Sequence, residues 1–221
     1  MQPSSPETAP VSPAPVTPQS DVPRTPHAKS RDGLKNVVAT IAVLIAAPLV
    51  ALFITSFVFQ SYEVFGPSMQ TTLHDGDRLI VMKAPRTWSK ITHHTYMPMR
   101  GQIVVFTKAD LLIESGDGSK QLIKRVMALP GEKVSVKDGV LTVYNKAHPD
   151  GFQPDKEGAY GSVIKHTGIN GDWTVGEGQV FVAGDNRDNS LDSRSFGPID
   201  TKDIVGTAAF RFLPIKQSRK F

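Results

Sequence analysis

The sequence of 221 residues contains no cysteine. This absence excludes disulfide bonds, thiolate metal sites and a cysteine nucleophile. It leaves the compartment open, because oxidising compartments permit disulfides without requiring them. The formal net charge of +4 is small, and no basic cluster of the kind that binds nucleic acid stands out. We therefore expect no nucleic-acid partner.

Charged residues are absent from residues 37–59, VVATIAVLIAAPLVALFITSFVF. As a helix this stretch would be roughly 34 Å long, enough to cross a hydrocarbon core of about 30 Å. A cleavable signal peptide is the rival interpretation. The length, the long segment before it and the lack of an A-x-A-like site at its end favour a transmembrane helix instead.

Basic residues are missing for a long distance on one side of this span. Four cations precede it within residues 24–35, whereas no Lys or Arg follows it until Arg78. The positive-inside rule therefore predicts a cytoplasmic N-terminus and an extracytoplasmic region over residues 60–221. The sequence thus predicts a single-pass protein of the cell membrane, with the lipid bilayer as a partner.

Prolines are concentrated before the span. Residues 1–26 hold eight of the 17 prolines, with Ser, Thr and Ala between them. Such a segment cannot bury enough apolar area to offset the entropy lost on ordering. Residues 1–36 are therefore predicted to form a disordered cytoplasmic tail.

A long amphipathic helix pattern is lacking beyond residue 60. Short apolar runs such as RLIVMK, QIVVF, QVFVAG and IVGTAAFRFL alternate with turn signals, a pattern that predicts a mainly β, antiparallel domain. The stretch KVSVKDGVLTVY predicts a hairpin with Asp138-Gly139 as its two-residue turn. Residues from about 138 to 172 are predicted to include a small insertion.

The stretch FGPSMQTTL contains the first candidate for chemistry. Gly66 and Pro67 predict a tight turn that exposes Ser68 a few residues beyond the span. An ordinary turn serine is the simpler interpretation of this stretch alone. No G-x-S-x-G elbow occurs, and no histidine has a recognisable nucleophile setting.

The stretch QLIKRVMALPGE places two cations within an apolar run. Because side chains alternate along a strand, Lys124 and Arg125 would face opposite sides. Burial disfavours the charged form of a lysine, and a neutral lysine is a competent base for a serine nucleophile. The alternative is that Lys124 reaches out to solvent. Arg125 stays charged and should find water or a carboxylate.

The stretch GDNRDNSLDSR follows another predicted strand. A calcium loop of the EF-hand type would need Gly at the position of Ser190 and Glu at that of Phe196. We therefore expect no metal here. A hydrogen-bonded loop is the simpler interpretation, in which four side chains pair among themselves: Arg187, Asp188, Asp192 and Arg194.

The order of a membrane span, GPSM, RGQIVVF, IKRVMALPGE and GDNRDNSLDSR resembles that of the bacterial type I signal peptidases. The resemblance implies an antiparallel β fold of the kind shared with repressor-type peptidases. It also implies a serine endopeptidase that removes N-terminal signal peptides from exported preproteins without a cofactor. Substrates of this family carry small residues at positions −1 and −3 from the cleaved bond.

The resemblance assigns roles by position. Ser68 matches the nucleophile and Lys124 the general base of the family. Ser190 matches the serine that hydrogen-bonds the lysine and orients it. Asp192 and Arg194 match an ion pair that braces the loop around this serine.

Two further positions lie beside the expected nucleophile. Met69 matches a residue near the S1 pocket. Gly66 stands where some members carry a serine whose hydroxyl stabilises the oxyanion, so the second oxyanion donor cannot be named from the sequence.

Two other functions fit parts of the pattern. One is a non-catalytic, membrane-anchored β module. The other is a self-cleaving repressor-type peptidase with a serine–lysine pair, which would need a DNA-binding domain where this chain has a proline-rich tail and an apolar span.

Overall fold

The computed structural model describes residues 31–70, 72–92, 95–108, 120–157, 164 and 166–221. The chain divides into two units, residues 1–45 and 46–221. Most of the predicted tail, residues 1–30, lies outside the described residues. Its last six residues, 31–36, belong to helix α1 (Arg31–Phe53).

The apolar stretch is helical almost throughout. Helix α1 contains Pro48 and continues into a π-helical turn, η1 (Ile54–Val58). The helical segment Lys35–Val58 is long and apolar enough to cross a membrane. Phe59, predicted as the last residue of the span, instead begins the first strand. Many apolar side chains of α1 are exposed, Leu44 by 68% for example.

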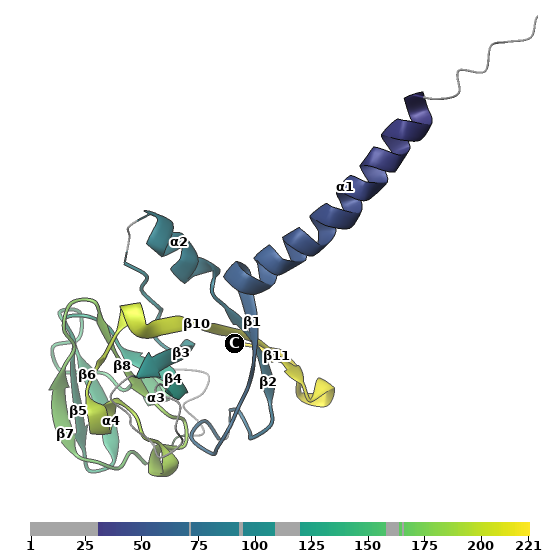
Figure 1. Cartoon of the computed structure of the whole chain (residues 1–221). Helices are drawn as coiled ribbons and strands as arrows, with labels where there is room; N and C mark the ends of the chain where they lie inside the picture. Colours follow the sequence, from purple (N-terminus) through teal and green to yellow (C-terminus); the bar gives the residue numbers. More distant parts are fainter. Residues whose placement is uncertain (1–30, 71, 93–94, 109–119, 158–163, 165) are drawn as a thin grey trace, which may run out of the picture. The chain divides into compact units, whose positions relative to one another are not determined.

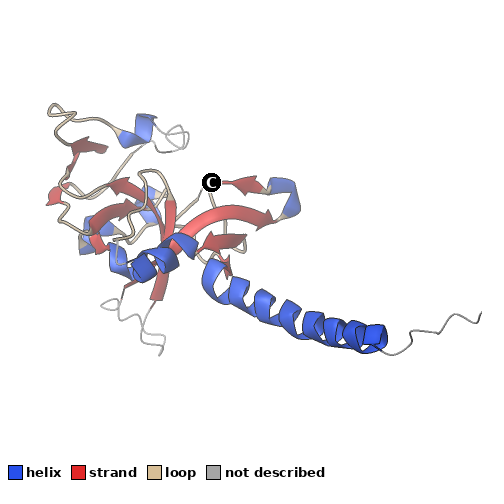
Figure 2. Ribbon diagram, turned by 90° about the horizontal axis from the view of Figure 1, so that it is seen from above, coloured by secondary structure: helices blue, strands red, loops and turns tan. Residues whose placement is uncertain are grey.

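Residues 46–221 include two antiparallel sheets (Figures 1 and 2). The order of the main path of the larger sheet is β1 (Phe59–Glu63), β2 (Arg78–Met82), β10 (Ile204–Leu213), β3 (Ile103–Lys108), β4 (Lys120–Ala128), β8 (Gln179–Ala183) and β9 (Ile199–Asp200). Strand β11 (Arg219–Lys220) pairs with β10. The smaller sheet has the order β6 (Val140–Tyr144), β5 (Lys133–Lys137) and β7 (Gly171–Thr174). The prediction of a mainly β, antiparallel fold is confirmed.

Short helices lie in the connections between the strands. The α-helices are α2 (Ala84–Thr92), α3 (Pro154–Glu157) and α4 (Ser193–Phe196), and the 3-10 turns are η3 (Arg187–Asn189), η4 (Thr201–Asp203) and η5 (Ile215–Gln217).

The predicted hairpin joins β5 and β6. Asp138 and Gly139 form its turn, with φ values of 50° and 78°, as a two-residue hairpin turn of type I′ requires. Leu141 and Val143 of β6 are buried in the core. The first residues of the segment predicted to include an insertion, 138–172, are therefore part of the smaller sheet.

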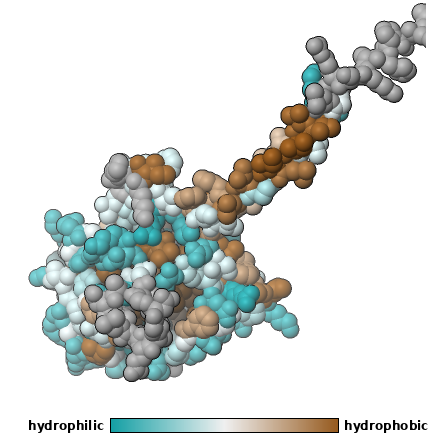
Figure 3. Space-filling view, in the orientation of Figure 1, coloured by the Kyte–Doolittle hydropathy of each residue, from teal (hydrophilic) through white to brown (hydrophobic). Residues whose placement is uncertain are grey.

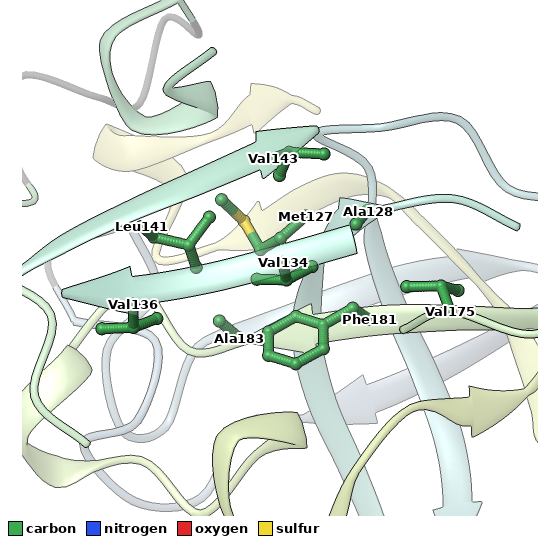
Figure 4. Packing of buried hydrophobic residues seen from close by; sticks show 9 residues of the cluster. All are labelled: Met127, Ala128, Val134, Val136, Leu141, Val143, Val175, Phe181 and Ala183. Atoms are coloured by element: carbon green, nitrogen blue, oxygen red, sulfur yellow. The ribbon is translucent and has the colours of Figure 1, made fainter. Parts of the chain in front are cut away.

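The smaller sheet packs against the ends of β4 and β8 (Figure 4). The shared core consists of Met127, Ala128, Val134, Val136, Leu141, Val143, Val175, Phe181 and Ala183. Val134 and Val136 point to one face of β5, and the other face carries Ser135 between the exposed Lys133 and Lys137, so only one face of the strand is apolar. Burial of this face holds the end of β4 in place.

Strand β4 is paired on both sides over only part of its length. Residues 120–125 pair with β3, but pairing with β8 begins at Arg125. The other edge of residues 120–124 is left without a strand partner among the described residues. Strand β1 is the terminal strand of the same sheet. The edges of β1 and of residues 120–124 of β4 are therefore available for pairing.

Strand β10 lies in the middle of the larger sheet and carries a buried cation. Arg211 of β10 donates from Nη1 to Oδ2 of Asp77 at 2.7 Å, and their side chains are only 6% and 3% exposed. The same Nη1 donates to the carbonyl of Thr72 at 3.2 Å. This ion pair ties the connection between β1 and β2 to the centre of the sheet.

Asp77→Asn should lower the free energy of unfolding by about 3–5 kcal/mol, because it leaves a buried guanidinium without a counter-charge. The matched control is Asp200→Asn, which breaks an exposed pair with Lys202 and should cost less than about 1 kcal/mol. Urea unfolding followed by tryptophan fluorescence measures both. Equal effects would contradict the buried ion pair.

Candidate active site

Ser68 lies in a fixed turn between β1 and β2. Gly66 has a φ of 85°, and its N–H donates to Oδ1 of Asp75 at 2.7 Å. The N–H of Gln70 donates to the carbonyl of Pro67 at 3.0 Å. A left-handed φ favours glycine, which explains the residue two positions before Ser68. The turn thus holds Ser68 with its side chain half-buried.

The structure brings Lys124 to this hydroxyl. Lys124 is only 2% exposed, and its Nζ lies 2.8 Å from Oγ of Ser68. The same Nζ donates to the carbonyl of Ile123 at 2.9 Å. The pairing of Lys124 with Val104 of β3 fixes the backbone that carries the amine. Lys124 therefore lies inside the protein and does not reach out to solvent.

Ser190, which the resemblance implies orients the lysine, lies beside the turn that carries Ser68, and its orienting role stays a prediction. Its Oγ is buried but has no hydrogen-bond partner in the part of the chain that the structure describes. The hydroxyl lies against Gly184, where an added Cβ would be 2.2 Å from it. The close packing against Gly184 sets the position of this hydroxyl.

Asp192 and Arg194 form the expected ion pair, and both are completely buried at their side chains. Oδ1 of Asp192 accepts from Nε of Arg194 at 2.8 Å, and Oδ2 accepts from the N–H of Gly184 at 2.9 Å. Burial alone would raise the pKa of Asp192. Hydrogen bonds from Arg194 and the charge of Arg194, with a hydrogen bond from the N–H of Gly184, hold this pKa below its ordinary value. The carboxylate is therefore ionised at neutral pH.

The other two charged residues of the expected network have different partners. Arg187 pairs with Asp155, which lies in the segment 138–172. Asp188 is exposed, and its nearest ionisable partner among the described residues is His166 at 3.8 Å. The prediction that Arg187 and Asp188 pair within the loop is therefore wrong. Both partners come from residues distant in sequence, which the loop sequence alone does not reveal.

Arg125 faces away from Lys124 and reaches a carboxylate, one of the two partners expected. Its Nε and Nη2 donate to Asp185 at 2.8 and 2.6 Å, and its Nη1 donates to the carbonyl of Gly101 at 2.7 Å. The pair is buried. Arg125 therefore ties the strand that carries Lys124 to residues 184–194, here called the bracing loop.

Two residues of the bracing loop, Gly184 and Asn186, contact residues 67–68 of the turn that carries Ser68, here called the serine turn. Neither was singled out from the sequence. The N–H of Asn186 donates to the carbonyl of Ser68 at 3.0 Å, and its Nδ2 donates to that of Pro67 at 3.1 Å. A Cβ on Gly184 would lie 2.4 Å from the carbonyl oxygen of Ser68. The sequence signal for this contact is Gly184, the first residue of GDNR, because glycine permits such close approach of two backbone segments.

A groove of about 460 Å³ runs beside Ser68 and Lys124. Its apolar walls include Tyr62, Phe65, Val105, Leu122, Ile123 and Leu191. Met69 was expected near this groove. Its side chain is fully buried in a core cluster that includes Val64 and against which Ile123 packs, and these two residues line the groove. Met69 therefore supports the turn from behind.

Metal ligands do not gather in this region. Within the described ranges, no group of three His, Asp or Glu residues is arranged to hold a metal ion. The chemistry available at the site is that of a hydroxyl beside a buried amine, which suits nucleophilic attack by Ser68 with Lys124 as the base.

Residues 35–213 match the family model described as "Signal peptidase, peptidase S26". A signal peptidase I of Bacillus licheniformis is 35% identical over 87% of this chain and 97% of its own length. A probable signal peptidase I-1 of Synechocystis is 38% identical over 79% of this chain and 81% of its own. A crystal structure of a signal peptidase I from Enterococcus faecalis covers 51% of this chain and 97% of its own, at 27% identity and a TM-score of 0.37.

Gly184→Ala should lower preprotein cleavage by about 100-fold or more, because displacement of a reacting group by about 1 Å can cost that much. The new methyl would overlap the Ser68 carbonyl and the Ser190 hydroxyl. Gly176→Ala is the control, since its Cβ would meet only the flexible side chain of Gln179. The test compares the rates at which the two purified variants cleave a preprotein in detergent. Near-normal cleavage by Gly184→Ala would contradict the geometry.

The family model covers most of the chain. This match favours a signal peptidase over the two alternatives, a non-catalytic module and a self-cleaving repressor. The chain belongs to the signal peptidase family, peptidase S26, and is a serine endopeptidase of the bacterial type I signal peptidases.

Proposed function

We propose that the chain cleaves signal peptides from exported preproteins with Ser68 as nucleophile and Lys124 as general base. The observation that carries this proposal is the distance of 2.8 Å between Nζ of Lys124 and Oγ of Ser68. An amine that is 2% exposed loses its proton more readily than one in water, because burial disfavours the ammonium. A neutral amine at this distance can accept the hydroxyl proton.

The reaction then proceeds in two halves. Oγ of Ser68 attacks the scissile carbonyl carbon while its proton moves to Nζ of Lys124. Collapse of the tetrahedral intermediate breaks the C–N bond, and the lysine returns the proton to the leaving amine. Water, deprotonated by the same lysine, attacks the acyl group, and the ester bond breaks as Ser68 regains a proton.

The oxyanion of the intermediate needs hydrogen-bond donors. The N–H of Ser68 donates no hydrogen bond within the part of the chain that the structure describes, so it can donate to the oxyanion. The N–H of Gly66 is occupied by Asp75. One preorganised donor contributes about 2.7–4 kcal/mol to the transition state in other enzymes.

The unpaired edges of β1 and β4 suggest how the substrate binds. The groove is lined by Tyr62–Ser68, which begin in the last two residues of β1, and by Gln121–Lys124 of β4. An extended peptide placed there can pair with an edge by main-chain hydrogen bonds. Its side chains at −1 and −3 then point to the same face, since they are two residues apart. One apolar wall can thus require small side chains at both positions.

The preprotein is proposed to meet the enzyme at the outer surface of the cell membrane. The segment Lys35–Val58 serves as a single membrane anchor, with the N-terminus in the cytoplasm and residues 60–221 outside. Anchoring confines enzyme and substrate to one interface, which raises their effective concentration.

Helix α2 supports contact with the bilayer. Its exposed face carries Trp88 and Ile91, which are 68% and 66% exposed and lie one turn apart. The helix is tied to the end of the proposed anchor, where Oγ1 of Thr87 donates to the carbonyl of Phe57 at 3.1 Å. Figure 3 shows apolar surface over this part of the domain. Tryptophan beside apolar side chains is typical of the membrane interface.

Ser68→Ala and Lys124→Ala should each abolish cleavage of a preprotein while the domain stays folded. Lys124→Arg should be equally inactive, because arginine does not lose its proton. Gel assays with purified, detergent-solubilised variants measure cleavage, and circular dichroism checks folding. Substantial activity in Lys124→Arg would exclude the proposed mechanism.

The contact with the bilayer can be tested by fluorescence, because the chain has only two tryptophans. In Trp173→Phe, Trp88 is the only emitter, and brominated lipids in proteoliposomes should quench it strongly. The control is Trp88→Phe, whose remaining Trp173 packs against Phe181 in the domain core. Equal or absent quenching in the two variants would contradict docking of α2.

A further inference from the structure

We propose that Asp155 is a positioning residue for the reaction and acts through Arg187. Asp155 belongs to the short helix α3, between the strands β6 and β7 of the smaller sheet. The inference rests on the proposed function of Ser68 and Lys124. It gives the segment 138–172, first interpreted as including an insertion, a role in the active site.

The contact between the two residues is bidentate. Nη1 and Nη2 of Arg187 donate to Oδ2 and Oδ1 of Asp155 at 2.7 and 2.6 Å. The Arg187 side chain is 1% exposed and that of Asp155 is 12% exposed. Oγ1 of Thr167, from the same segment, also accepts from Nη1. Such a fork geometry fixes the guanidinium in both position and direction.

Arg187 transmits this position to the backbone of the bracing loop. Its Nε donates to the carbonyl of Gly184 at 2.9 Å, and its own carbonyl accepts from Nη2 of Arg194 at 2.7 Å. Nη1 of Arg194 donates in turn to the carbonyl of Gly168 at 3.0 Å. Both arginines of the loop are therefore held by residues between β6 and β7.

The bracing loop is the part of the site that this support would affect. Gly184 packs against the Ser190 hydroxyl and the carbonyl of Ser68, and Asn186 donates to that same carbonyl. A buried guanidinium that loses its carboxylate must move towards water or stay unpaired at high cost. Movement of Arg187 would shift Gly184 and Asn186, and with them the serine that must stay beside Lys124.

A purely structural role for Asp155 makes a different prediction. In that case the ion pair would only stabilise the domain, and any loss of activity would follow the fraction unfolded. A positioning role lowers kcat in molecules that remain folded. It leaves KM nearly unchanged, because neither Asp155 nor Arg187 lines the groove.

The test compares Asp155→Asn with two controls in a fluorogenic signal-peptide assay, at a temperature where every variant is folded. Asp172→Asn makes the same chemical change at an exposed position of β7. Val143→Ala weakens the core of the smaller sheet without touching the loop. Asp155→Asn should lower kcat by about tenfold or more with KM within about twofold. Both controls should keep kcat, and Asp155→Glu should restore most of it.

A normal kcat in Asp155→Asn would overturn the inference, as would an equal loss of kcat in Val143→Ala. Ser68→Ala in the same assay separates this failure from that of the proposed function. Cleavage by Ser68→Ala would refute the assignment of the nucleophile. An inactive Ser68→Ala beside a fully active Asp155→Asn would refute only the positioning role.

Discussion

The constraint on which the site depends is the burial of one amine next to one hydroxyl. Lys124 is almost inaccessible, yet its Nζ lies within hydrogen-bonding distance of Ser68. Burial favours the neutral amine that the proposed mechanism needs, and it is also costly unless the surroundings are fixed. The strand that carries the lysine is held by β3 on one side and, from Arg125 onward, by β8 on the other. The fold thus protects the amine and keeps an adjacent edge open.

Four arginines are buried in the described part of the domain, and each meets a carboxylate. The pairs are Arg125–Asp185, Arg187–Asp155, Arg194–Asp192 and Arg211–Asp77. Buried ion pairs often contribute little net stability compared with apolar residues of similar size. Their common feature here is geometric. Arg125–Asp185 and Arg187–Asp155 join the bracing loop to other elements, and Arg211–Asp77 joins β10 to the connection between β1 and β2. Arg194–Asp192 is a contact within the bracing loop. Together they fix the loop and the turn relative to β4.

The sequence predicted the features that depend on local pattern. Alternation along β4 placed Lys124 and Arg125 on opposite sides, and Asp138-Gly139 marked the hairpin turn. Tertiary packing decided the feature that was mispredicted. The partner of Arg187 lies 32 residues away in sequence. No local pattern encodes a contact of that kind, and the assignment of Ser68 and Lys124 drew on the order of motifs as a whole.

The place of β10 in the larger sheet has a consequence for biosynthesis. This strand comes near the end of the chain but lies between β2 and β3. Until β10 is synthesised, the hairpin of β1 and β2, which bears Ser68, has no strand through which to join β3 and β4, the second of which bears Lys124. The two side chains that the proposed mechanism needs therefore meet only once β10 is in place, so an unfinished chain lacks the assembled site.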